Sequence, residues 1–110
     1  MVVKFSDKAK QWKEGYYLLE RATEHLEEIL GPSAGSVSVE WDRREDARGR
    51  SQYIVKLSDH TGEVTDAFAP SELELRSHMR YRLLDLWGKL LQRRSDEQMK
   101  KLQELVKEGG

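Results

Sequence analysis

Apolar residues recur along this chain with two different periods, and each period predicts a different kind of element. In residues 6–30 the apolar side chains follow the three-and-four spacing of one helical face. These positions are Trp12, Tyr16, Leu19, Leu26 and Leu30. Ser6 fits the N-cap, and Gly31 followed by Pro32 is typical of a helix end. We therefore predict one N-terminal helix over residues 6–30.

The middle of the chain alternates apolar and polar residues instead. Segments 37–41, 52–57 and 63–69 have apolar side chains at every second position, as half-buried strands do. Residues 58–62 supply turn chemistry between the last two. We predict a three-stranded antiparallel meander over residues 37–69, covered on one face by helices. The predicted fold class is α+β, in one domain that spans residues 1–110.

One polar residue disturbs this alternation. Asp66 falls on the same face of its strand as Val64 and Phe68, towards the core. A buried carboxylate needs a partner, or its pKa rises. We favour a β-bulge that turns Asp66 outward. The alternative is an inward Asp66 that pairs with Arg80 or Arg50.

A second helical segment is predicted over residues 71–107. Ser71 and Glu74 have the spacing of a capping box at its start. Ser95 and Gln98 have the same spacing, so we predict a break near residues 93–95 and a separate short C-terminal helix. The alternative is one unbroken helix over 72–107, about 54 Å long at the usual rise of 1.5 Å per residue.

The apolar face of this segment is wider than a helix on a single sheet requires. One stripe comprises Leu75, Met79, Leu83, Leu86 and Leu90, and further apolar residues widen it to about half the circumference. We expect the surplus to bind a second copy of the chain or another protein. The expected interface residues are Leu84, Trp87, Leu91, Met99 and Leu102.

The distribution of charge between the two helical segments suggests an alternative function, the binding of nucleic acid. Residues 76–94 carry six bases against one acid, whereas residues 14–30 carry five acids against one base. The favoured interpretation is that the two helices pack side by side and their opposite charges largely compensate each other. If they do not, Arg76, Arg82, Lys89 and Arg93 form a candidate nucleic-acid surface. Residues 40–50 hold four acids and four bases and are predicted to be a solvated connection between strands.

The sequence offers little chemistry for catalysis. It contains no Cys and three His, and no two His have the spacing of a helical zinc site. We expect His60 to lie in a turn, His78 among Arg residues, and His25 to face away from the apolar stripe. No phosphate-binding or nucleophile motif occurs. We therefore expect no enzyme, cofactor or metal. We also expect no membrane span and a soluble, cytoplasmic interaction module.

Overall fold

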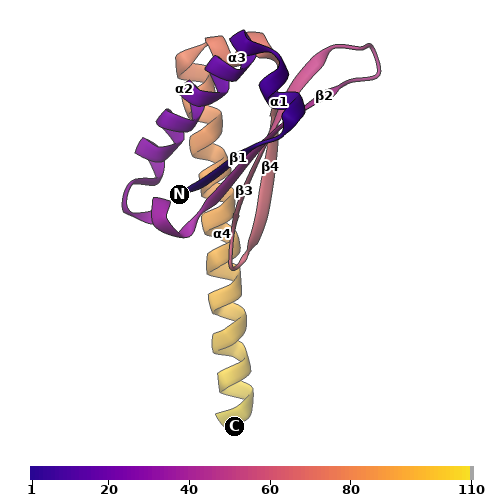
Figure 1. The fold of residues 1–110 in the computed structure, drawn as a ribbon. Coiled ribbons are helices and arrows are strands. Elements are labelled where there is room, and N and C mark those ends of the chain that lie inside the picture. Colours follow the sequence, from indigo (N-terminus) through magenta and orange to yellow (C-terminus); the bar gives the residue numbers. More distant parts are fainter. Residues whose placement is uncertain (110) are drawn as a thin grey trace.

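The structure is a computed structural model that describes residues 1–109, with side chains described as far as Val106 (Figure 1). Its elements follow one another as β1 (Val2–Phe5), α1 (Asp7–Gln11), α2 (Lys13–Leu30), the 3₁₀ helix η1 (Gly31–Ser36), β2 (Ser38–Glu45), β3 (Ser51–Asp59), β4 (Gly62–Phe68), α3 (Pro70–Glu74) and α4 (Arg76–Gly109). The predicted class, α+β, is confirmed.

The sheet has four strands in the order β1-β2-β3-β4, not the three of the predicted meander. β2, β3 and β4 pair antiparallel as expected, and β1 adds a parallel edge strand in which Val3 pairs with Val39. Sequence reasoning missed β1 because its four residues are too few to show a clear period. The parallel pairing fits its connection to β2, which runs through the helices α1 and α2.

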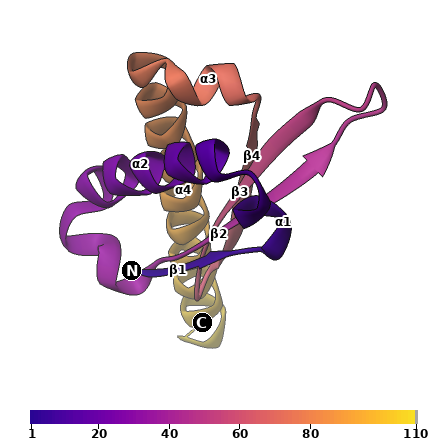
Figure 2. The same ribbon diagram turned by 45° about the horizontal axis from the view of Figure 1, so that its top comes forward.

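The core lies between one face of the sheet and the helices α2 and α4 (Figure 2). The alternating residues of β2 and β3 point into it, as predicted. Its largest fully buried side chains include Trp41, Tyr53, Phe68, Leu19, Leu26, Leu57, Met79, Leu83, Leu86 and Leu90. The apolar faces predicted for the helices and the strands therefore pack together in a single hydrophobic core.

The predicted helix 6–30 is interrupted at Trp12, which has extended backbone angles between α1 and α2. The Trp12 ring stacks on Tyr53, with ring centroids 6.4 Å apart. Tyr53 in turn reaches Gly15, where an added Cβ would lie 1.9 Å from the phenol oxygen. The break thus accompanies an aromatic contact between the partly exposed Trp12 and the buried Tyr53, which helical periodicity alone does not reveal.

The start of the C-terminal helical segment also differs from the prediction. Glu72, not Glu74, accepts the capping hydrogen bond, from the Ala69 backbone N–H at 2.9 Å. The short helix α3 ends at Glu74, and its C-cap residue, Leu75, is exposed rather than part of the core stripe. α4 begins directly after it.

α4 is one unbroken helix of 34 residues, so the predicted break near residues 93–95 is wrong. The segment around Ser95 has neither Gly nor Pro, and Gln92 donates a hydrogen bond to Asp96 one turn later, at 3.0 Å. Its second half projects well beyond the sheet (Figure 1), which accounts for the extents of 58 × 31 × 23 Å. Among the described helices, none combines the length and apolarity needed to cross a membrane.

Candidate protein-interaction site

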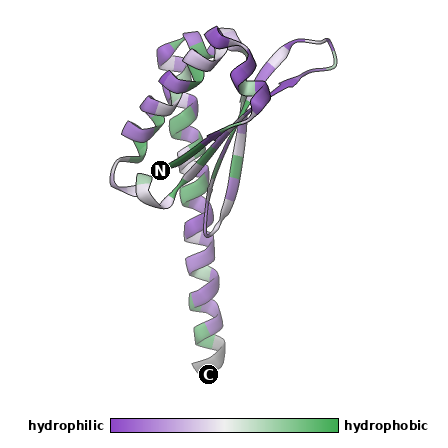
Figure 3. Ribbon diagram, in the orientation of Figure 1, coloured by the Kyte–Doolittle hydropathy of each residue, from purple (hydrophilic) through white to green (hydrophobic). Residues whose placement is uncertain are grey.

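A line of exposed residues runs along the outer side of α4. We call it the outer seam, and it comprises Tyr81, Leu84, Gly88, Leu91, Ser95, Gln98, Leu102 and Leu105. Successive members are separated by alternating steps of three and four residues, which is the heptad spacing of a coiled-coil contact. Met99 and Val106 flank its lower half. Figure 3 shows apolar bands among polar ones along the projecting helix.

The other side of α4 fixes the orientation of this seam. Met79, Leu83, Leu86 and Leu90 are buried against the sheet and α2. Leu84 and Leu91, which follow Leu83 and Leu90 in sequence, are 55% and 42% exposed. α4 therefore has two apolar faces, of which the domain covers one.

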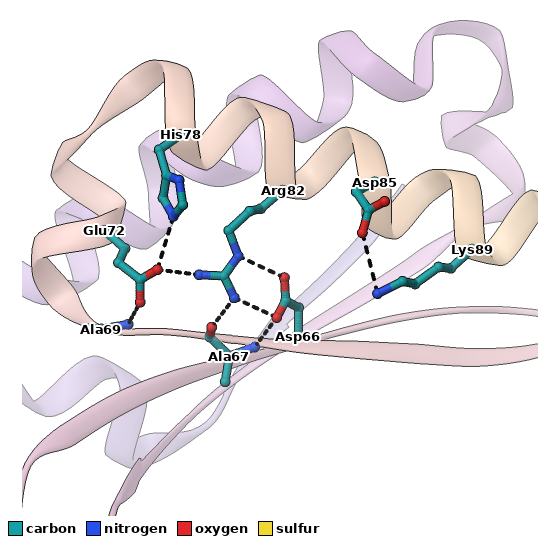
Figure 4. A network of polar contacts seen from close by, with 8 residues as sticks. All are labelled: Asp66, Ala67, Ala69, Glu72, His78, Arg82, Asp85 and Lys89. Carbon is teal, nitrogen blue, oxygen red and sulfur yellow. Dashed lines mark hydrogen bonds and ion pairs between the residues drawn. The ribbon is translucent and has the colours of Figure 1, made fainter.

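Arg82 anchors the first half of α4 to the edge strand β4 (Figure 4). Its Nη2 donates to Asp66 Oδ1 at 2.6 Å and its Nε to Asp66 Oδ2 at 3.2 Å. Arg82 also pairs with Glu72 and lies over the Phe68 ring. A backbone donor at Ala69, with His78 and Arg82, holds the pKa of the Glu72 carboxyl below its usual value despite some burial.

This geometry corrects the prediction for Asp66. The ladder between β3 and β4 is continuous, with Asp66 directly opposite Val55, so no bulge turns it outward. It faces the helices and pairs with Arg82, rather than with Arg80 or Arg50.

Arg94 anchors α4 again at the end of the sheet. It donates to Asp59, the last residue of β3, and to Ser36 Oγ at 3.0 Å. The Asp59 side chain is 0% exposed. Burial opposes its ionisation, but hydrogen bonds from Thr61 and Arg94 outweigh that effect and lower the pKa of Asp59. Beyond Arg94 the helix leaves the domain.

Arg80 joins the acidic and basic helices. Its Nη1 donates to His25 Nδ1 at 2.6 Å and to Glu28 Oε2 at 3.0 Å. His25 was expected to face away from the apolar stripe, yet its side chain is only 12% exposed and lies against α4. Burial, together with Arg80, lowers the pKa of His25. The predicted side-by-side packing of α2 and α4 is present. Among the described residues, however, Arg80–Glu28 is the single ion pair between the two helices.

The five expected interface residues separate into two groups. Leu84, Leu91, Met99 and Leu102 are exposed, and the last two help to line a shallow apolar groove. Trp87 is only 7% exposed and packs in the core, under the Arg94 guanidinium. Sequence reasoning missed Tyr81, Leu105 and Val106 as exposed members of the same surface. The heptad spacing was the available signal, but the assumed break at 93–95 concealed it.

The four candidate nucleic-acid residues do not form one free basic face. Arg82 is committed to Asp66 and Glu72, and Lys89 Nζ lies 3.3 Å from Asp85 one turn away. Arg76 and Arg93 are exposed. The charged loop is shorter than predicted, because β2 continues to Glu45 and the turn occupies residues 46–50. Asp46 accepts hydrogen bonds from the backbone N–H groups of Arg48 and Arg50 there.

Elsewhere on the described surface, the side chains give little support for a catalytic or metal-binding site. A cavity of about 400 Å³ lies between α2 and α3, lined by Trp12, Lys13, Glu14, Tyr17, Leu18 and Glu74. This lining brings no His or Ser beside its carboxylates. In the part of the chain that the structure describes, no cluster of three His, Asp or Glu has the arrangement of a metal site.

Comparison with known protein families, curated proteins and solved structures finds no match to this chain. The outer seam of α4 is thus the feature from which a function has to be inferred.

Proposed function

We propose that this protein is a non-enzymatic interaction module of the cytoplasm that self-associates through the outer seam of α4. The observation that carries the proposal is the exposure of Leu84, Leu91 and Leu102 along one line of a helix whose opposite side is already packed. Exposed apolar residues are common singly, but their repetition at heptad spacing along one side of a helix is typical of a surface that binds another helix.

The projecting half of α4 gives a second reason. From Ser95 to Gly109 the helix extends past its last anchor, Arg94. A segment of about 15 residues is only marginally helical in water on its own, and most helical stability in proteins comes from packing of an apolar face. Met99, Leu102, Leu105 and Val106 provide such a face. Burial of each would contribute roughly 1.5–3 kcal/mol, which supports a partner for this segment.

Nucleic-acid binding is the weaker alternative. It would need Arg76, Lys89 and Arg93 to act without Arg82, whose side chain is only 22% exposed. The chain as a whole has a formal net charge of −1. A binding surface of this size would show little of the salt-dependent affinity that many phosphate contacts produce.

Size-exclusion chromatography with light scattering tests the proposal. The expected mass is twice the 12.8 kDa of one chain. Leu102→Glu should return the protein to the monomer because it places a charge in the seam. Lys100→Glu is the matched control, since Lys100 is exposed on the opposite side of the same helix. It changes the charge more but should leave the dimer intact, whereas equal effects of the two substitutions would contradict the proposal.

A further inference from the structure

We infer that the partner of the outer seam is a second copy of α4 that runs in the opposite direction, with the two-fold axis near residue 93. The inference rests on the self-association proposed above and adds its geometry. In this arrangement the projecting half of each helix packs along the exposed Tyr81–Leu91 half of the other.

The residue sizes along the seam support this direction. Two antiparallel helices with heptad spacing place each first-position residue opposite a fourth-position residue of the partner. Centred near residue 93, the layers are Tyr81 with Leu105, Leu84 with Leu102, Gly88 with Gln98, and Leu91 with Ser95. Each small residue then faces a larger one, as close packing requires.

Gly88 is the member that the single chain does not explain. It lies in the middle of α4, where Gly is less favourable than Ala. Apart from the adjoining turns of α4 itself, an added Cβ there would meet no atom of the described residues within 4 Å, so the domain itself does not require a residue without a side chain. In the antiparallel pair, Gly88 provides a notch between Leu84 and Leu91 that accommodates the stem of Gln98 from the other copy.

The parallel arrangement packs less well. It would place Gly88 against Gly88 and Ser95 against Ser95, and these two layers of small residues would leave unfilled space on either side of the Leu91 layer. Unfilled space in a packed interface loses both contacts and burial.

Charge favours the antiparallel pair in the same sense. Residues 76–94 carry six bases and one acid, whereas residues 95–106 carry two bases and three acids. Arg80, Arg82 and Arg94 already have carboxylate partners in the domain, which reduces the difference without reversing it. An antiparallel pair sets the basic half of each helix beside the acidic half of the other, and a parallel pair sets the two basic halves together.

Single cysteines test the direction, because the chain has none of its own. Gly88→Cys and Gln98→Cys are each made in the full chain, and the two variants carry tags of different size. Each is first confirmed as a dimer by light scattering under reducing conditions. They are then oxidised separately and as a re-equilibrated mixture, and disulfide-linked chains are resolved by mass.

The inference predicts cross-linking only in the mixture, as the species that contains both tags. Residue 88 then faces residue 98, while two copies of residue 88 lie about 15 Å apart along the axis, too far for a disulfide. Efficient cross-linking of each variant with itself would establish a parallel pair. A dimer that cross-links in no sample would exclude this register. Either result would overturn the inference but leave self-association standing, whereas a monomeric wild-type chain would overturn both.

Discussion

Arg82 holds Asp66 with two hydrogen bonds across the gap between helix α4 and strand β4, the shorter of them 2.6 Å long. Both side chains are mostly buried, and the planar guanidinium matches the carboxylate in a bidentate pair. This pair acts together with the buried residues of the same helix, such as Leu83 and Leu86, in fixing the rotation of α4 about its axis and hence which of its residues remain outside.

Removal of this guanidinium should therefore destabilise the fold. Arg82→Gln is expected to lower the free energy of unfolding by about 1.5–3 kcal/mol, as hydrogen bonds to charged groups contribute when largely buried. Arg82→Lys should recover only part of this, because an ammonium cannot reproduce the bidentate geometry. Urea denaturation followed by circular dichroism measures both. Lys89→Gln is the control in the same helix, where loss of the exposed pair with Asp85 should cost less than about 1 kcal/mol. Comparable losses for Arg82→Gln and Lys89→Gln would contradict the anchoring role.

Gly15 is expected to tolerate no side chain. In Gly15→Ala the new Cβ would lie 1.9 Å from the Tyr53 oxygen and 2.6 Å from Trp12 Cε3. Forcing a methyl group into such a packed site typically costs about 1–3 kcal/mol, measurable by urea denaturation. Gly35→Ala, where an added Cβ meets nothing within 4 Å, should change stability little.

A second substitution checks that the Tyr53 hydroxyl is the cause. Within the part of the chain that the structure describes, this buried hydroxyl has no hydrogen-bond partner, so Tyr53→Phe alone should be neutral or stabilising. In the Gly15→Ala background, Tyr53→Phe should restore part of the lost stability. A purely additive effect of the two changes would show that the clash is absent.

The same substitution should affect two neighbouring leucines of α4 differently: at Leu83 it should destabilise the fold, and at Leu84 it should weaken the dimer. Leu83 is fully buried, so Leu83→Ala should lower the free energy of unfolding by about 2–5 kcal/mol. Leu84 is exposed on the outer seam, so Leu84→Ala should change the stability of the isolated chain little but weaken the dimer. Denaturation and light scattering over a dilution series separate the two effects. A Leu84→Ala variant that unfolds as readily as Leu83→Ala would place Leu84 in the core instead.

Asp59 should contribute to stability in a pH-dependent way. Its pKa is lower in the folded chain than in the unfolded chain, because hydrogen bonds from Thr61 and Arg94 outweigh its burial. The folded state therefore binds this proton less readily. The contribution is fully present above the unfolded pKa of about 3.9 and is lost as pH falls through the lower folded value. Asp59→Asn should reduce stability at neutral pH and flatten its decline between about pH 5 and pH 2, as followed by thermal melts. An unchanged acid slope would exclude this role.

The spacing of apolar residues along the sequence was sufficient to predict the central strands and most of the core. In a strand with one buried face, burial requires an apolar residue at every second position, as at Val37, Val39 and Trp41. Contacts between distant segments were not predictable in the same way. The partner of Asp66 on β4 is Arg82, and which residue reaches Asp66 is decided by how α4 packs against the sheet. The interruption at Trp12 likewise accompanies its contact with Tyr53, which lies on a distant strand. The break assumed near Ser95 shows a further limit. A Ser followed three residues later by Gln marks a helix start only when the chain turns there. In an unbroken helix the same residues are ordinary members of an exposed face.

The molar mass of the chain in solution tests the central claim most directly. Light scattering across a concentration series should show a species of twice 12.8 kDa that dissociates on dilution and that Leu102→Glu abolishes while Lys100→Glu does not. A mass of 12.8 kDa at every concentration would contradict the account, because Leu84, Leu91 and Leu102 would then remain in contact with water.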